Sequence, residues 1–460
     1  MIELERLKKI YAERKEEILQ DYFTFLRFPS VTTDPSFGKE VTGCALWLAD
    51  YLKKSGLQVE TWENGVAPIL FAQDLRAGPE RETLLLYAHY DVQPVDPVEL
   101  WDSPPFEPTI RDGQVYARGA SDDKGQCFYT AVALRLLLQE LKDLPINIKF
   151  LIEGEEESGS AGLFQKIEEK KELLQADSLL IVDSGFISLD RPGITLGTRG
   201  IVCIDLCLRE ANQDLHSGIF GGIAYNPNKA LVELLAKLHD SNGRVAIPGF
   251  YDQITHLSPE EKELYTFRLD TPYIEKNFGF TPSGMEEGIS PIEASTLHPK
   301  IEINGLSGGY AGEGFKTVIP AEAHAKLSCR LVPNQDPEAI GNLVRNFLLE
   351  NTPPSLRAEV EIHPGGGPAF RASPHSRVAK VLEKAYADVF ALPIEKVFLG
   401  GTIHIVPALE KITGGETALI GVALYDDAVH SPNEHFGLDR LALGYLTICH
   451  IIQLLATLPT

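Results

Sequence analysis

The sequence contains few cysteines and is poor in positive charge. Its six cysteines are scattered over 460 residues, mostly in apolar surroundings, and none belongs to a C-x-x-C pair. This pattern predicts buried thiols and supports neither a disulfide framework nor a zinc site made of thiolates. Lysine and arginine number 42 against 65 acidic residues, so the formal net charge is -23. Because phosphate contacts need basic side chains, we expect no nucleic-acid partner.

The sequence also lacks a leader-like N-terminus and a long apolar run. Residues 1–10 are charged and amphipathic, and no later run is expected to span a bilayer. We therefore expect a soluble, cytoplasmic protein with no membrane partner. Hydrophobic residues make up 44% of the chain and charged residues 23%, which is an ordinary globular composition. A chain of this length is expected to form two domains, or one domain with a large insertion.

Apolar runs separated by helical stretches fill the first part of the chain. Strands are expected at residues 83–88, 146–152 and 178–182. Helices are expected at residues 3–28, 40–54, 125–141 and 162–174. Strands that are apolar on both faces and alternate with helices indicate a doubly wound, mostly parallel α/β sheet. Ligands of such sheets bind at the carboxyl ends of the strands.

The pattern changes at about residue 200. Residues 201–208 and 323–331 alternate between apolar and polar, which is typical of a sheet with one open face. Residues 243–296 are rich in proline, glycine and charge and are expected to be irregular. We therefore predict an α/β domain in two parts with an α+β insertion between them. The two parts of the α/β domain are expected at residues 1–198 and 367–460, and the insertion at residues 199–366.

Acidic residues and histidines follow the expected strands or lie in the adjoining loops. The set comprises His89, Asp91, Asp122, Asp123, Glu155, Glu156, Glu157, Asp183 and His430. Each member alone also fits a structural role: a helix cap, a turn residue or part of a solvated acidic loop. Carboxylates and imidazoles together, without cysteine, are the ligands expected in zinc, manganese or cobalt hydrolases. Their convergence on one edge of a sheet therefore favours a metal site.

Six segments resemble, in order and spacing, the dinuclear-metal peptidase family that includes carnosinase-type dipeptidases and aminoacylases. The segments are AHYDVQP, WDSPPFEPTIRDGQVYARGASDDKGQ, IEGEEESGSAGL, DLHSGIFGG, VIPAEAHAKLSCRLVP and HSPNEHFG. The resemblance extends from near residue 20 to the C-terminus and is closest to the carnosinase-like dipeptidase branch. It implies that the α/β domain is catalytic and that the insertion is the lid and dimerisation domain of a homodimer.

The resemblance implies ligands for two divalent metal ions per subunit. Asp122 is expected to bridge the two ions. His89 and Asp183 are expected to complete one site, and Glu157 and His430 the other. Zn²⁺ is the first expectation, and the same ligands also suit Mn²⁺ or Co²⁺.

The resemblance also implies catalytic roles beside the metal ligands. Glu156 is expected to be the general base for the attacking water, and Asp91 is expected to orient the first histidine ligand. A cis peptide bond is expected between Asp122 and Asp123. Glu155 receives no role by resemblance and is expected to be a solvated loop carboxylate.

The insertion is expected to supply residues on the substrate side. His216 resembles the residue that reaches across a dimer to stabilise the tetrahedral oxyanion. Arg330 resembles the group that grips the C-terminal carboxylate of the substrate. Asn226 and Thr317 are further candidates for lining the substrate pocket.

Two departures from the family pattern concern the substrate side. Relatives often have Gly-Gly-Ser-Ile-Pro where this chain has Gly-Gly-Thr-Ile-His at residues 400–404. The hydroxyl group is kept as Thr402, a substrate-binding candidate, but the proline is replaced by His404. His363 lies one position away from the histidine of the carnosinase pattern. Both departures affect the expected specificity and leave the metal ligands intact.

The predicted function is that of a metal-dependent dipeptidase acting on dipeptides or short peptides with a free C-terminal carboxylate. An aminoacylase-like amidohydrolase of N-acyl amino acids is the alternative, because the metal motifs do not separate the two. The third hypothesis is a catalytically inactive dimer that serves as a scaffold. The intact ligand and base positions argue against this third hypothesis.

Overall fold

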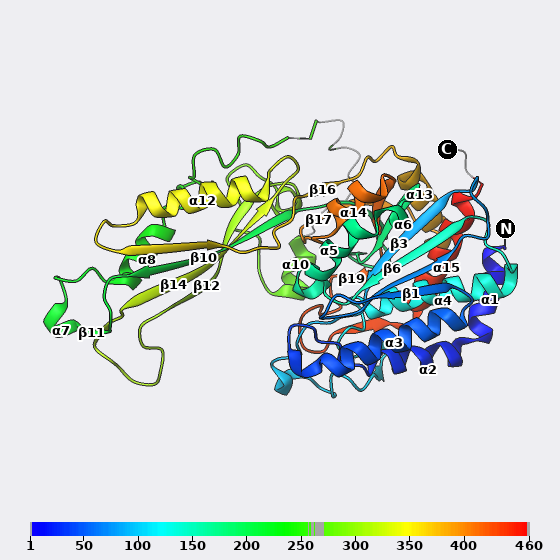
Figure 1. The fold of residues 1–460 in the computed structure, drawn as a ribbon. Coiled ribbons are helices and arrows are strands. Elements are labelled where there is room, and N and C mark those ends of the chain that lie inside the picture. The colour runs from blue at the N-terminus through cyan, green and yellow to red at the C-terminus, as the bar shows by residue number, and fades with distance from the viewer. Residues whose placement is uncertain (1, 256, 259–261, 263–270, 458–460) are drawn as a thin grey trace.

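The chain folds into two bodies that lie side by side, each built on its own sheet (Figure 1). The computed structural model describes residues 2–255, 257–258, 262 and 271–457. The larger body is an α/β unit around a nine-stranded sheet, and the smaller body contains a four-stranded antiparallel sheet. This architecture confirms the predicted fold class. The exact domain limits stay a prediction. The last strand of the large sheet before the small body is β9 (Gly193–Thr198), and the first strand of the small sheet is β10 (Gly200–Arg209).

The central strands of the large sheet are parallel and buried. The sheet order is β1 (Gln58–Trp62), β2 (Ile69–Asp74), β6 (Asn147–Glu153), β3 (Thr83–His89), β7 (Ser178–Val182), β18 (Glu416–Ile420), β9 (Gly193–Thr198) and β16 (Phe370–Arg371), with β17 (Glu395–Leu399) also beside β9. β6, β3, β7 and β18 run in the same direction. Every residue of β6 and β7 is buried, because helices lie on both sides of the sheet (Figure 1). The three predicted strands therefore form the centre of the sheet.

Helices of the large body follow the predicted pattern with two breaks. They are α1 (Leu4–Glu13), α2 (Lys15–Leu26), α3 (Gly38–Lys54), α4 (Lys124–Leu141), α5 (Ala161–Glu169), α6 (Lys171–Leu174), α13 (Arg377–Phe390), α14 (Val406–Thr413) and α15 (Leu438–Leu455). The expected single helices at 3–28 and 162–174 are each two helices, because the backbone leaves the helical conformation at Arg14 and Lys170.

The C-terminal helix α15 corrects the expectation that no apolar run is long enough to span a membrane. Its 18 residues have sufficient length and a mean hydropathy of 1.3. However, 72% of the helix is buried inside the fold, where it packs against α1, α4 and α13. Its apolar character therefore matches that of a core helix.

The small body has one covered and one open sheet face. The sheet order is β12 (Lys300–Gly308), β14 (Glu322–Leu331), β10 (Gly200–Arg209) and β15 (Arg357–Ile362). Every second residue of β10 is buried, and these side chains form a core with α8 (Pro227–Leu235) and α12 (Pro337–Asn351). The intervening residues lie on the opposite face and are only partly buried. This alternation is the pattern expected for a half-covered sheet.

Short elements complete the two bodies. They are β4 (Thr109–Arg111), β5 (Gln114–Tyr116), β8 (Gly185–Phe186), β11 (Leu215–His216), α7 (Ser217–Phe220), α10 (Thr271–Phe278), α11 (Pro291–Thr296), β13 (Val318–Ile319), β19 (Ala423–Leu424) and β20 (His435–Gly437). The segment 243–296, which was expected to be irregular, therefore contains two helices near its end. Residues 256, 259–261 and 263–270 of that segment lie outside the described residues.

Candidate functional site

The candidate site lies at the carboxyl ends of the central parallel strands. β3 ends at His89, β6 ends just before the three consecutive glutamates, and β7 ends just before Asp183. Because these strands are adjacent and parallel, their ends meet at the same edge of the sheet. The loop before α4 adds Asp122, and the loop after β19 adds His430.

Asp122 lies between the two histidines. Its Oδ1 is 3.1 Å from Nε2 of His89, and its Oδ2 is 2.9 Å from Nε2 of His430. On one side, Asp183 Oδ2 is 3.9 Å from Nε2 of His89. On the other side, Glu157 Oε1 is 3.3 Å from Nε2 of His430. The structure thus brings the five expected ligands together as two groups that share Asp122, with ligand atoms within 4.8 Å of one another in each group.

Asp91 connects the histidine to the glutamate segment from a fully buried position. Its Oδ1 is 3.3 Å from Nδ1 of His89. Its carboxylate also accepts the backbone N–H groups of Glu156 at 3.2 Å and Glu157 at 3.0 Å, and the hydroxyl of Thr32 at 3.1 Å. Nδ1 of His89 also lies 3.1 Å from the backbone carbonyl of Asp91, so Asp91 faces the imidazole with two oxygen atoms, as expected. Sequence reasoning did not find the hydrogen bonds by which the same carboxylate holds the backbone of both glutamates.

The three glutamates follow the end of β6 in a changed backbone conformation. A short 3₁₀ helix at Glu156–Ser158 replaces the alternation of a strand, so Glu156 and Glu157 line the same pocket. The expectation that Glu155 is solvated was wrong. Glu155 is 5% exposed, and its Oε2 accepts a hydrogen bond of 2.6 Å from Nδ2 of Asn64.

A buried carboxylate holds the loop that presents Asp122. Glu434 accepts the backbone N–H groups of Gly119, Ser121 and Asp122 at 2.8, 2.9 and 3.0 Å. It also pairs with the guanidinium of Arg118 at 2.8 Å. The expected cis peptide bond after Asp122 is confirmed. Sequence reasoning missed Glu434, although this residue lies in the same HSPNEHFG segment as the histidine ligand.

The carboxylates of the site are buried close together, so their negative charges need a compensating positive charge. Hydrogen bonds to the Asp122 and Glu157 carboxylates raise the pKa of His430 to about 11. Burial would raise the pKa of Asp122, but hydrogen bonds from His430 and His89 hold it well below its usual range. Burial raises the pKa of Asp183 to about 7. Buried carboxylates are costly without compensating charge, and the oxygen and nitrogen donors present here fit divalent cations.

A pocket of about 550 Å³ opens beside these ligands. It is lined by Asp122, Glu156, Glu157, Asp183, Thr198, Arg199, Ser295, Thr296, Leu399, Gly400, Gly401, Thr402, Ile403, Tyr425, Val429 and His430. Arg330 Nη1 donates to the Thr402 hydroxyl at 2.9 Å, and the same hydroxyl donates to the Arg199 carbonyl at 2.6 Å. Thr402, an expected substrate residue that lines this pocket, is therefore in contact with a second one, Arg330.

The two departures from the family pattern occupy different places. Burial, followed by the charge of Arg330, lowers the pKa of His404, whose Nδ1 is buried without a hydrogen-bond partner among the described residues. His363 instead pairs with Asp205 at 3.1 Å on the open face of the small sheet. His404 is therefore the departure that lies close to the substrate side.

Three other expected substrate residues lie in the small body. The Nδ1 atom of His216 accepts the backbone N–H of Gly218 at 2.9 Å, in the turn that begins α7. The carbonyl of Thr317 accepts the backbone N–H of Ser217, and Asn226 caps α8. α7 and β11 lie at the end of the small sheet that is remote from the large body (Figure 1). Within one chain, His216 therefore does not reach the metal ligands, and its expected role requires a second subunit.

The fold and the site together define a metal-dependent hydrolase with a two-body α/β architecture. The sequence profile of peptidase family M20/M25/M40 matches residues 85–454, and the chain belongs to this family.

Named relatives match along nearly the whole chain. The human Beta-Ala-His dipeptidase is 32% identical over 427 residues, which cover 88% of this chain and 83% of the relative. The structure of the dipeptidase Dug1p from Saccharomyces cerevisiae aligns with a TM-score of 0.88 at 25% identity and covers 99% of both chains. The M20 family metallo-carboxypeptidase Sso-CP2 from Sulfolobus solfataricus aligns with a TM-score of 0.88 at 32% identity, covering 96% of this chain and all of the other.

Proposed function

We propose that this protein is a dipeptidase that hydrolyses dipeptides and short peptides with a free C-terminal carboxylate. The observation that carries the proposal is the position of Asp122 between two histidines, each backed by a further carboxylate. The named relatives include two dipeptidases, which supports the same substrate class.

Two divalent cations per subunit are part of the proposal. His89, Asp122 and Asp183 would hold one ion, and Asp122, Glu157 and His430 would hold the other. Zn²⁺ is the proposed ion, with Mn²⁺ or Co²⁺ as alternatives of similar ligand preference. When bound, such ions polarise the scissile carbonyl and lower the pKa of water.

Glu156 is the proposed general base. It lines the pocket beside the ligands without belonging to either ligand group. Burial raises the pKa of Glu156 well above its usual range, and a raised pKa makes a carboxylate more basic. Glu156 would accept the proton of the attacking water and deliver it to the nitrogen of the leaving amine. Asp91 fixes the backbone that carries this base.

Arg330 and Thr402 are the proposed receptors of the substrate carboxylate. The guanidinium of Arg330 is partly buried and donates a hydrogen bond to the hydroxyl of Thr402, which lines the pocket. A planar guanidinium binds a carboxylate through paired hydrogen bonds, so it selects substrates with a free C-terminus.

A homodimer formed through the small body completes the proposal. Ile219 and Ile223, next to His216, are 63% and 80% exposed. Apolar side chains gathered at one tip are typical of a surface that a partner covers. A second copy would bring His216 to the oxyanion position, with Asn226 and Thr317 nearby. We further propose a cytoplasmic location, supported by six cysteines that are all free thiols.

A substrate panel tests the proposed reaction. Dipeptides, tetrapeptides and N-acetyl amino acids are compared at equal concentration with the metal-loaded protein. We expect the highest kcat/KM for dipeptides. A preference for tetrapeptides would indicate a carboxypeptidase, the activity in the name of the relative from Sulfolobus solfataricus. A preference for N-acetyl amino acids would indicate the aminoacylase alternative and would contradict the proposal, whereas a preference for tetrapeptides would exclude only dipeptides as the preferred substrates.

A further inference from the structure

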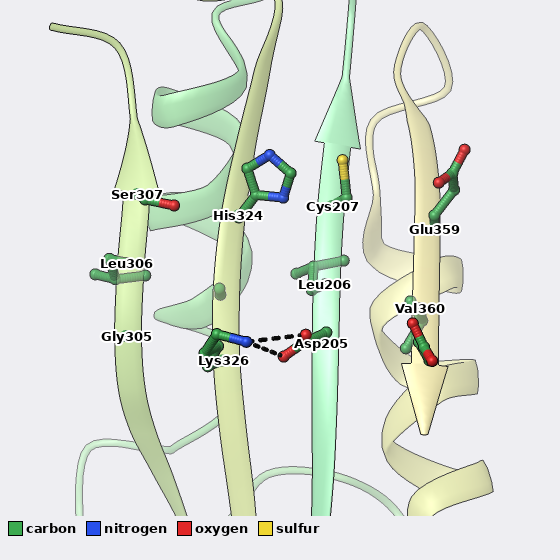
Figure 2. A pocket seen from close by; sticks show the side chains of 12 residues that line it. Asp205, Leu206, Cys207, Gly305, Leu306, Ser307, His324, Lys326, Glu359 and Val360 are labelled. Carbon is green, nitrogen blue, oxygen red and sulfur yellow. Dashed lines mark hydrogen bonds and ion pairs between the residues drawn. The ribbon is translucent and has the colours of Figure 1, made fainter. Parts of the chain in front are cut away.

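The open face of the small sheet carries a second set of metal-ligand side chains. A pocket of about 600 Å³ lies over this face, away from the helices that cover the other side. Figure 2 shows Ser307, His324, Cys207 and Glu359 in one row across the four strands. Below that row, Lys326 pairs with Asp205 at 3.0 Å. The upper row therefore keeps a thiol, an imidazole and a carboxylate without a lysine among them.

Cys207, Glu322 and His324 form a compact ligand group. Cys207 on β10 is the direct cross-strand partner of His324 on β14, a register that places Cβ atoms about 4.5–5.5 Å apart. Glu322 lies two residues before His324, so both side chains project from the same face of the strand. Glu322 Oε1 is 3.3 Å from Nε2 of His324. One ligand atom from each of the three residues lies within 4.8 Å of the other two.

The ligand groups of the proposed active site have the same spacing, with ligand atoms within 4.8 Å of one another. Among the described residues, three groups have this spacing: the two that share Asp122 and the group around Cys207. The group around Cys207 belongs to a different sheet and contains a sulfur ligand, which neither of the others has. It is therefore separate in place and in chemistry from the proposed active site.

The surroundings of Cys207 do not favour a disulfide or a nucleophile. Cys203 is on the same face of β10, but four residues of extended chain separate the two by about 13 Å, too far for a disulfide. Burial raises the pKa of the Cys207 thiol, and the nearby Glu322 carboxylate raises it further. Reactive cysteines instead have lowered pKa values in electropositive surroundings.

We propose that Cys207, Glu322 and His324 bind a zinc ion on the open face of the small sheet. Zn²⁺ accepts thiolate, imidazole and carboxylate ligands together, and thiolate sulfur disfavours Mg²⁺ and Ca²⁺. Arg209 forms an ion pair with the Glu322 carboxylate and so holds this ligand in place. Glu359 is the partner of Cys207 on its other side, but its carboxylate is not part of this ligand group.

The proposed zinc site goes beyond what the sequence motifs indicated for the cysteines. A thiolate zinc site was not expected because no C-x-x-C pair occurs. Here the ligands come from two antiparallel strands that are distant in the sequence, and one cysteine is combined with a Glu-x-His pair. Only the register of β10 against β14 brings these residues together.

Cobalt spectroscopy tests this proposal independently of peptide hydrolysis. A thiolate bound to Co²⁺ gives an intense near-ultraviolet charge-transfer band, whereas histidine and carboxylate ligands do not. The full-length protein is stripped of metal and titrated with Co²⁺. We expect the band in the wild type and its loss in Cys207→Ser. A wild type without the band, or a Cys207→Ser variant that keeps it, would overturn the proposal.

Matched variants complete the cobalt experiment. Cys203→Ser changes a thiol on the same face of the same strand and is expected to keep the band. If Cys207→Ser does not fold, Glu322→Gln and His324→Gln retain the thiol and test the other two ligands. Each is expected to weaken Co²⁺ binding, measured from the same band, by about ten-fold or more. Unchanged affinity in both variants, or loss of the band in Cys203→Ser, would contradict the assignment.

Discussion

At the scale of single residues, Glu156 is the side chain on which the proposed proton transfer depends. Glu156→Gln keeps the size of the side chain and removes its basicity. We expect kcat to fall by about 10²- to 10⁴-fold, because a positioned base contributes this much to proton transfer. The metal content, measured on the same preparation, is expected to stay at the wild-type level. A variant that retains a tenth of the activity would exclude Glu156 as the base.

Arg330 is the residue that we expect to bind the free C-terminal carboxylate of the substrate. Arg330→Ala removes charged hydrogen bonds worth about 1.5–3 kcal/mol, so kcat/KM for dipeptides should fall roughly 10- to 150-fold. The same peptides with an amidated C-terminus serve as the control, since they lack the charge that Arg330 binds. In the variant, kcat/KM for the free peptides should therefore come closer to kcat/KM for the amidated peptides. If both sets lose activity equally, Arg330 acts through the fold and not through the substrate carboxylate.

Residues at the active site were predictable to different degrees. His89 ends one buried strand and Asp183 follows the next, so their meeting at one end of the parallel sheet follows from the topology. The burial of Glu155 was not predictable, because Asn64, its hydrogen-bond partner, comes from a distant loop. Contacts between loops depend on the completed packing and leave no periodic signal in the sequence.

At the scale of elements, the loop before α4 depends on an anchor from the other end of the chain. Glu434, just before β20, accepts three backbone N–H groups of the loop that carries Asp122. Periodicity predicted α4 and the central strands, because burial of whole elements repeats along the sequence. It did not predict this anchor, since one buried carboxylate that binds backbone groups has no periodicity.

Glu434→Gln tests the anchor. The amide places a donor group where only acceptors are needed, so we expect metal affinity to fall by about 10- to 100-fold. Isothermal titration of the metal-stripped protein measures this change. Glu416→Gln is the matched control, because Glu416 also accepts two backbone N–H groups, those of Arg377 and Val378, but at the start of α13. Equal losses in the two variants would mean that the effect is general destabilisation.

At the scale of the whole molecule, the position of His216 decides whether the proposed active site is formed by one subunit or by two. In one chain this residue lies at the remote end of the small body (Figure 1). His216→Ala is expected to lower kcat by roughly 10²- to 10³-fold, the effect of losing one oxyanion donor. An undiminished kcat would refute the role.

Subunit mixing tests whether His216 acts in the partner. His216→Ala and Glu156→Gln subunits are co-expressed, each expected to be inactive alone. In a mixed dimer, one of the two sites would contain both an intact base and an intact histidine. Because random assortment makes about half of the dimers mixed, roughly a quarter of the wild-type activity should return. If no activity returns while mass spectrometry shows mixed dimers, the two residues do not act across the interface.

The metal centre is the central claim, and anomalous diffraction at the zinc edge from metal-loaded crystals tests it most directly. We expect one peak among His89, Asp122 and Asp183 and a second among Asp122, Glu157 and His430, in protein that hydrolyses dipeptides. Active crystals with no anomalous peak beside Asp122 would contradict it.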